Sequence, residues 1–295
     1  MKDKSDILRK RIIDVIFILL CIFVLFTFLL VLGSSFTSQD SINKFGYNII
    51  PKQFSLEAYK SVFADKARVI SAYKITFIVT LLSTILGLFF TSMLGYVTSR
   101  KDYPYRNIVA FYCFFAMLFN GGLVPTYILI ANWLHLKNTI WAMVFPAGVN
   151  IWNMLLMKGF FSSLPTSLIE AAKIDGLGEF KIFLQIIIPL SKPAFATVGL
   201  FFILGSWNQW FSSMLYTDKQ ELVTLQYMLM KVMKNAEFMG SDLAMQTGAL
   251  QAGQTVPADN LKMAMCIVAA GPILVVFPFF QKYFTRGITV GAVKG

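Results

Sequence analysis

Residues 12–32 read IIDVIFILLCIFVLFTFLLVL, an apolar run whose one charged residue, Asp14, lies near its start. A helix needs roughly 20 apolar residues to cross the hydrocarbon core of a bilayer, so this run is long enough to span one. Basic residues precede it, as in a signal peptide. However, the run is too long for a signal-peptide core, and no small-residue cleavage site follows it. The stretch therefore predicts an uncleaved transmembrane helix.

The whole chain has the composition of an integral membrane protein. Of its 295 residues, 57% are hydrophobic, 15% are aromatic and only 14% are charged, which is roughly half the charge of a soluble domain. This composition excludes a disordered protein, a coiled coil and an ordinary cytosolic enzyme. Lys and Arg outnumber Asp and Glu by 26 to 15, but the bases are not clustered with aromatic residues, which argues against nucleic acid as a partner.

Six apolar stretches are long enough to cross a bilayer, so we expect an all-α integral membrane protein with six transmembrane helices. The expected spans are residues 12–32, 69–98, 106–131, 138–158, 190–216 and 261–281. With six spans both termini lie on one side, and assigning that side to the cytoplasm places 15 Lys and Arg inside and 11 outside. The positive-inside rule favours this orientation in the cell (plasma) membrane. The expected parts are a cytoplasmic N-terminus, a transmembrane domain and a cytoplasmic tail, at residues 1–11, 12–285 and 286–295.

The expected span interiors lack the groups that ion-coupled transport and catalysis need. No Asp, Glu, Lys, Arg or His occupies the central part of any of them, whereas proton and sodium relays depend on such side chains or on broken-helix ion sites. No G-x-x-x-x-G-K-[ST], H-E-x-x-H or G-x-S-x-G motif occurs, and the single His, His135, falls in a short external turn. The three cysteines show neither a disulfide framework nor zinc spacing. A secondary transporter and an intramembrane enzyme are therefore disfavoured, and any energy source comes from a partner.

One loop on the expected cytoplasmic side, residues 159–189, concentrates charged and small residues. Ser163 or Ser167 can cap a short helix, and Ser167 with Glu170 has the spacing of a capping box. Gly176 can end this helix, because a residue without a Cβ adopts the left-handed conformation at little cost.

A second short helix is expected at residues 179–187, and Pro189 is expected to end it before the next span. The two helices would form a compact knob with an apolar stripe. Such a knob suits a hydrophobic cleft on another protein, and it suits the membrane surface equally well.

The run E-A-A-x-x-D-G at residues 170–176, followed by Ile186-x-Ile188-Pro189, resembles the EAA loop of bacterial ABC importer permeases. Ile188 stands where Leu is common in that family. Residues 119–127 (FNGGLVPTY) and 138–141 (NTIW) look like the carbohydrate-uptake branch, and residues 286–295 are similar to the end of permeases for complex or polysaccharide-derived oligosaccharides. The resemblance extends over most of the chain, and the layout is like that of the shorter maltose permease subunit. It implies a type I ABC importer permease fold.

The resemblance also implies a role for the loop. In the family the loop docks into a groove of the ATPase subunit and transmits its closure, while ATP and Mg are bound by that partner. This chain would itself hold no cofactor or metal ion and would not be an enzyme. The coupling residues implied are Glu170, Ala171, Ala172, Asp175 and Gly176, with Pro189 joining the loop rigidly to the fifth span.

The fifth span carries Trp207-Asn208-Gln209-Trp210, at a position where family members show a Trp-Asn pair. Aromatic faces can stack on sugar rings and amides can bond sugar hydroxyls, so these four residues could line a sugar path. Contacts between helices and an aromatic belt near the outer interface account for them at least as well.

The function implied by the resemblance is ATP-driven import of an oligosaccharide by alternating access. The partners implied are a second permease subunit, two copies of an ATP-binding subunit, an extracellular solute-binding protein and membrane lipid. Residues 216–260 match in position the external loop that reaches into the binding protein in the maltose permease, but they share no motif with it, and a solvated cap on the helical bundle is the alternative. An ABC permease for a non-sugar solute is the alternative, and a secondary transporter is a more distant one. The sequence does not name the sugar.

Overall fold

The computed structural model describes residues 4–239 and 259–292. Within them every regular element is helical, and extended pairing is limited to an isolated bridge between Thr37 and Phe54. The chain divides into two compact units, Met1–Val69 with Leu229–Gly271 and Ile70–Met228 with Pro272–Gly295. The all-α prediction is therefore confirmed for the described part of the chain.

The first unit is held together by polar and aromatic contacts in the segment that follows its long first helix. The Asn260 amide Nδ2 donates to the Thr37 carbonyl over 3.2 Å, and the Asn260 backbone N–H donates to Gln39 Oε1 over 3.2 Å. Phe36 stacks on the ring of Tyr59 at 4.9 Å. The helices of this unit are α1 (Lys4–Ser35), α2 (Gln39–Phe45), α3 (Glu57–Val62), most of α14 (Leu225–Met239) and the first part of α16 (Asp259–Ala292).

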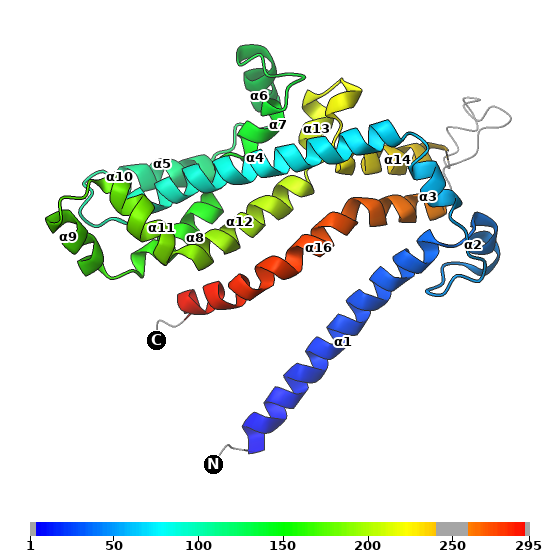
Figure 1. Cartoon of the computed structure of the whole chain (residues 1–295), viewed down its shortest axis with the longest axis horizontal. Helices are drawn as coiled ribbons and strands as arrows, with labels where there is room; N and C mark the ends of the chain where they lie inside the picture. Colours follow the sequence, from blue (N-terminus) through cyan, green and yellow to red (C-terminus); the bar gives the residue numbers. More distant parts are fainter. Residues whose placement is uncertain (1–3, 240–258, 293–295) are drawn as a thin grey trace. The chain divides into compact units, whose positions relative to one another are not determined.

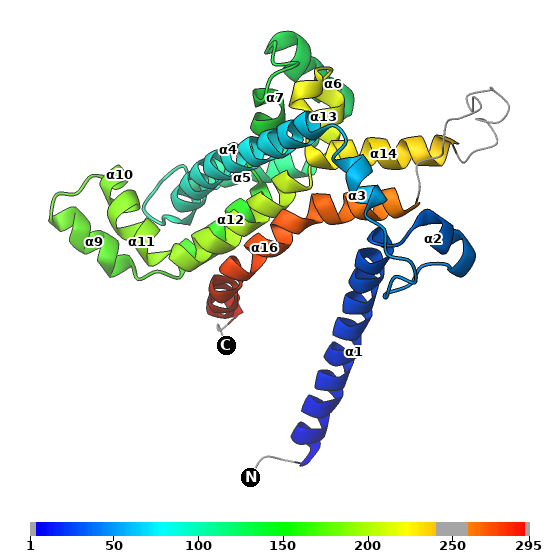
Figure 2. The same cartoon turned by 45° about the vertical axis from the view of Figure 1, so that its right-hand side comes forward.

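The second unit contains most of the remaining helices, which Figures 1 and 2 show from two directions. Its long helices are α4 (Lys66–Ser99), α5 (Arg106–Leu118), α8 (Ile151–Ser162) and α12 (Lys192–Trp207). Its shorter helical pieces are α6 (Leu123–Ile128), the π-helical turn η1 (Leu129–Trp133), α7 (Trp141–Val144), the 3-10 turn η2 (Phe145–Ala147), α9 (Thr166–Ile174), α10 (Glu179–Ile182), the π-helical turn η3 (Phe183–Ile187), α11 (Ile188–Leu190), α13 (Phe211–Tyr216) and the 3-10 turn η4 (Gln220–Leu222).

Helices α4, α8 and α12 form the core of the second unit. Tyr96 of α4, Met157 of α8 and Val198 of α12 belong to one buried cluster. The approach of α4 to α8 depends on Gly95, because a Cβ built there would lie 2.9 Å from Met157 Cβ and 3.3 Å from the Lys158 backbone nitrogen. Small residues let helix backbones approach in this way where apolar burial alone cannot drive association in a membrane.

Three described helices are long and apolar enough to cross a membrane, namely Leu8–Ser35, Lys66–Ser99 and Asp259–Phe279. They coincide with the expected spans at residues 12–32, 69–98 and 261–281. Two bent helix pairs raise the count to as many as five if each pair crosses as one span. The pairs are Arg106–Leu118 with Leu123–Trp133, bent by 111°, and Glu179–Leu190 with Lys192–Trp207, bent by 86°. The predicted count of six is not confirmed.

The other three expected spans are not single helices. Residues 106–131 are interrupted at Gly122, whose φ of 88° lies outside the helical range. Residues 138–158 are divided among α7, η2 and α8, and Pro146 lies in the break, where it removes a backbone donor. Residues 190–216 are divided at Ser191 and again between Trp207 and Phe211. Apolar length predicts where a chain can enter a bilayer, but it carries no information about breaks within that length.

The close approach at Gly95 gives a test of the packing. Gly95→Ala should lower the melting temperature of the detergent-solubilised chain, because the added Cβ meets backbone atoms of α8 that cannot rotate away. Overpacking of this kind costs about 1–3 kcal/mol. Gly159→Ala in α8 is the matched control, since a Cβ there meets nothing within 4 Å. Equal melting temperatures for the two variants would contradict the packing described for α4 and α8.

Candidate functional site

Helix α9 carries most of the residues expected to couple this chain to a partner. It begins at Thr166 after the extended residue Pro165, with no side-chain cap on its first turn. The predicted capping box is therefore wrong: Ser167 already lies inside the first turn, so its side chain is not at the capping position.

The end of α9 agrees with the prediction. Asp175 caps the helix, and Gly176 follows with a φ of +79°, the left-handed conformation expected for it. The Gly176 N–H donates to the Lys173 carbonyl and the Leu177 N–H to the Ala172 carbonyl, each over 3.0 Å. These bonds satisfy carbonyls that the helix end would otherwise leave free.

The two faces of α9 differ sharply in burial. Ala172 is 4% exposed and packs in the cluster formed with α4, α8 and α12. Glu170 and Ala171 are exposed, and Ile174 is 86% exposed although its side chain is wholly apolar. The EAA run therefore does not act as one surface: Ala172 fixes the helix to the unit, whereas Glu170, Ala171 and Ile174 point away from it.

The chain returns from α9 through a bent helical segment that anchors the loop. Ile182, Phe183 and Ile187 are buried at 3% exposure or less. Pro189 lies in the first turn of α11, and this segment continues to Leu190 before the chain bends at Ser191. The second helix therefore ends one residue after Pro189, close to where Pro189 was expected to end it. Pro189 still lies at the junction between the loop and α12, as expected.

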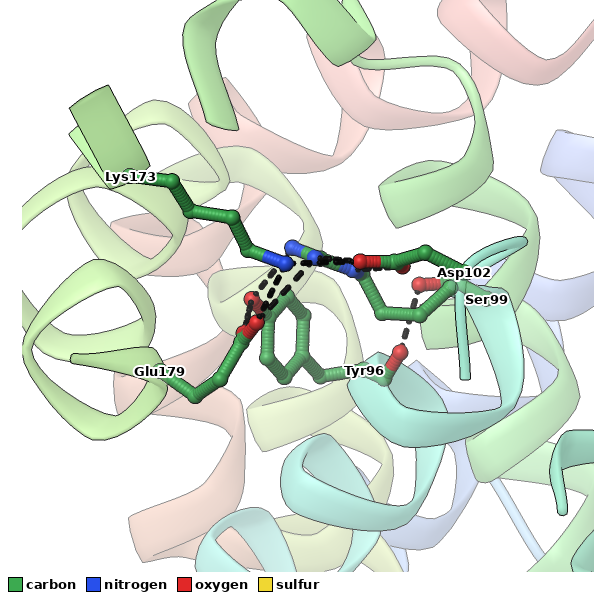
Figure 3. A network of polar contacts seen from close by, with 6 residues as sticks. Tyr96, Ser99, Asp102, Lys173 and Glu179 are labelled. Atoms are coloured by element: carbon green, nitrogen blue, oxygen red, sulfur yellow. Dashed lines mark hydrogen bonds and ion pairs between the residues drawn. The ribbon is translucent and has the colours of Figure 1, made fainter. Parts of the chain in front are cut away.

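A network of charged side chains links α9 to the end of α4 (Figure 3). The sequence had not predicted this network. Arg100, which directly follows α4, donates from Nε to Asp102 Oδ1 over 2.7 Å and from Nη2 to Asp102 Oδ2 over 2.5 Å. Arg100 Nη2 also lies 3.2 Å from Glu179 Oε1. Lys173, in the last turn of α9, contacts Asp102 Oδ2 at 2.7 Å and Glu179 Oε1 at 2.9 Å.

The hydroxyl of Tyr96 completes the network. It donates to Glu179 Oε2 over 2.9 Å and accepts from Arg100 Nη1 over 2.9 Å. The Tyr96 ring packs against Phe183 with centroids 5.3 Å apart, so the same residue joins the polar network to the apolar cluster beneath it.

The charges of this network balance, which explains how Arg100 can be buried. Its side chain is 9% exposed, and a charge removed from water needs partners of opposite sign with good hydrogen-bond geometry. The bidentate pairing with Asp102 supplies that geometry. Arg100 and Lys173 against Asp102 and Glu179 leave no net charge.

The pKa of the Asp102 carboxyl responds to these contacts. Hydrogen bonds from Arg100 and then from Lys173 hold the pKa of Asp102 well below its usual range. Hydrogen bonds to Asp102 and then to Glu179 raise the pKa of Lys173 above its usual value. Both groups are therefore ionised at neutral pH.

The residues expected to line a sugar path lie elsewhere in the second unit, at the break between α12 and α13. Trp207 is buried and lines a cavity of about 160 Å³ together with Thr80 and Thr84 of α4. Asn208 is exposed and donates to the Leu204 carbonyl over 2.9 Å. The buried Oε1 of Gln209 has no hydrogen-bond partner among the described residues.

Trp210 completes the expected group of four. It lies in the same break, immediately before α13, and packs edge-on against Phe211. The break thus brings Trp207 to Trp210 together locally, but it leaves them apart from the α9 network.

Sequence patterns gave no signal for the network. Arg100 and Asp102 lie in a short basic segment that reads as a solvated connection, and Lys173 and Glu179 lie at positions that the EAA resemblance leaves unassigned. Their only available signal was the alternation of two bases and two acids at the expected cytoplasmic ends of helices, which is too common to be specific.

Residues 6–290 match the family described as "Binding-protein-dependent transport system inner membrane component". Protein LplC of Bacillus subtilis (strain 168) is 36% identical over 268 residues, covering 91% of this chain and 88% of that protein. The polygalacturonan/rhamnogalacturonan transport system permease protein YtcP of the same organism is 33% identical over 279 residues, covering 95% of this chain and 94% of that protein.

The fold is also similar to a solved structure. One chain of a bacterial ABC transporter involved in the import of the acidic polysaccharide alginate superposes with a TM-score of 0.80 at 26% identity. The alignment covers 96% of this chain and 99% of that one.

The low pKa of Asp102 makes the stability of the second unit dependent on pH. A carboxyl whose pKa is lower in the folded state stabilises the fold above its unfolded pKa of about 3.9, and this contribution disappears as the pH falls toward the folded value. Asp102→Asn should therefore melt below the wild-type chain at pH 6. Allowing for solvent screening of a half-exposed group, we expect a loss of about 1 kcal/mol, or roughly 2–4 °C.

The same comparison at pH 3 in the same detergent distinguishes a charge effect from a packing effect. The difference between the wild-type chain and Asp102→Asn should narrow there, because the Asp102 carboxyl of the unfolded chain takes up a proton at pH 3 while that of the folded chain stays largely ionised. A difference of the same size at both pH values would show that Asp102 acts through its shape alone.

Proposed function

Because this chain belongs to the family of binding-protein-dependent transport system inner membrane components, we propose that it is the permease subunit of an ATP-driven ABC importer that carries an oligosaccharide across the membrane. The match over residues 6–290 carries this proposal. Two similar proteins point to the same substrate class: one is named as a permease protein of a polygalacturonan/rhamnogalacturonan transport system, and the other belongs to a transporter involved in the import of alginate.

The partners follow from the same proposal. A second permease subunit would complete the translocation path, two ATP-binding subunits would hold ATP and Mg, and an extracellular solute-binding protein would deliver the sugar. The orientation with both termini in the cytoplasm is supported by the distribution of Lys and Arg. It places α9 on the side where ATP is available.

The exposed face of α9 fits an ATPase contact. Ile174 is 86% exposed at the end of the helix, on the side expected to face the cytoplasm, where it is available as an apolar anchor for a groove on the partner. Glu170 and Ala171 lie on the same face, and Gly176 sets the turn that presents it. The pattern is that of a helix docking in a groove, where a few apolar anchors determine affinity.

The sugar path is proposed to pass the break between α12 and α13. Irregular backbone is tolerated at membrane depth where it lines a cavity, and broken helices mark binding sites in many transporters. Asn208 is exposed, so its amide is available to sugar hydroxyls, whereas the Oε1 of Gln209 is buried and has no partner among the described residues. Trp207 and Trp210 supply aromatic faces beside them.

Docking through Ile174 can be tested by co-purification. Ile174→Asp should reduce recovery of the ATP-binding subunits with the tagged chain at least about tenfold, because a buried, unpaired carboxylate costs more than about 1.4 kcal/mol. Ile50→Asp is the matched control, since Ile50 is 80% exposed and lies in the expected external loop. Full recovery of the ATP-binding subunits with Ile174→Asp would rule out α9 as their docking surface.

The substrate class can be tested by calorimetry of the cognate solute-binding protein against a panel of oligosaccharides, amino acids and metal chelates. We expect an oligosaccharide to bind at least about tenfold more tightly than any other class, or about 1.4 kcal/mol. Preference for an amino acid or a chelate would overturn the sugar assignment.

With the sugar that binds most tightly, Asn208→Ala should raise the concentration needed for half-maximal uptake into vesicles if the proposed path is correct.

A further inference from the structure

Helix α9 is joined to the rest of the second unit in two ways, by the chain itself and by side-chain contacts with α4. Along the chain, α9 leads through the π-helical turn η3 and the short α11 to α12, with a bend of 86° between Leu190 and Lys192. A bend and a π-helical turn are places where a displaced segment can change its angle without moving the next helix. Along the chain, motion of α9 therefore reaches α12 only across this bend.

Helix α4 offers a stiffer element. It is one uninterrupted helix from Lys66 to Ser99, and its 34 residues correspond to about 50 Å of length. Arg100 follows its last turn directly and is held by both acids of the network. A displacement applied at Arg100 is therefore applied to the end of a rod that reaches the cavity lined by Thr80 and Trp207.

Apolar packing alone would not fix α9 on α4. The contacts of Ala172 with the cluster around Tyr96 are non-directional, and packed helices can slide past one another by small shear motions. The charged contacts are directional, because the planar guanidinium of Arg100 binds Asp102 bidentately. Lys173, which belongs to α9, adds a second cation that pairs with the same two acids.

We propose that Arg100, Asp102, Lys173 and Glu179 form a clasp that makes α9 and the adjoining end of α4 move as one body, so that ATPase closure displaces α4 directly. Lys173 and Asp102 are positioning residues in this arrangement and contact neither ATP nor sugar. The inference rests on the proposed function, because it needs an ATPase that moves α9. It assigns α4 as the helix that receives that motion first.

The test measures one distance in the assembled transporter. Spin labels at Thr166→Cys, where α9 begins, and at Lys101→Cys, beside Arg100, report the separation of α9 from the end of α4; both positions are exposed. The three native cysteines are replaced by Ala, and ATP hydrolysis by this background must equal that of the wild-type complex. Distances are recorded without nucleotide and after trapping with ATP and vanadate.

With an intact clasp the distance distribution should stay narrow and centred at the same value in both states. Lys173→Met and Asp102→Asn should each give a displaced or second peak after trapping. The same variants should reduce stimulation of ATP hydrolysis by the cognate solute-binding protein at least about fivefold, the lower end of common coupling effects. Lys173→Arg and Asp102→Glu should restore both readouts.

Lys181→Met is the matched control, because it removes a cation from an exposed position in α10 that makes none of the ion pairs found among the described residues. Wild-type distances and stimulation in Lys173→Met and Asp102→Asn, or an equal loss in Lys181→Met, would overturn the clasp. If the wild-type complex shows no ATP hydrolysis and no vanadate trapping, the proposed function itself fails, which is a separate result.

Discussion

The buried guanidinium of Arg100 is the interaction on which the arrangement of the candidate site depends. Removal of a cation from water is costly, and the cost is offset only when acids surround it with good geometry. Asp102 lies two residues away and is supplied locally, but Glu179 comes from a helix 79 residues further along the chain. The requirement to neutralise Arg100 therefore brings the returning half of the loop to the end of α4, and α9 lies between them.

The same constraint explains why the loop can be rigid and still expose an apolar surface. Tyr96 joins the charged network to Phe183 and the cluster below, so the inner face of α9 is fixed by both polar and apolar contacts. The outer face of α9 is then not needed to hold the loop in place. Ile174 lies exposed on this face and is available to a partner subunit, as the proposed coupling role requires.

Individual residues show how far prediction from the sequence reached. The left-handed conformation of Gly176 was predictable because a glycine that follows a helix commonly adopts the conformation that ends the helix. The capping box at Ser167 failed because Pro165 starts the helix earlier than the Ser-x-x-Glu spacing suggests. The helix that Pro189 was expected to end stops at Leu190, one residue beyond it, where the chain bends.

The sequence by itself determined that this protein is helical, enters a membrane and belongs with importer permeases, because apolar length and a compact motif are local properties of the chain. Only the tertiary structure decided which expected spans are broken and which groups meet at α9. The break between Trp207 and Phe211 is flanked by the buried side chains of Trp207, Ser212 and Ser213, so it depends on the packing around it. The pairing of Arg100 with Glu179 depends on contacts across 79 residues, and no pattern within a short window of sequence encodes a contact of that separation.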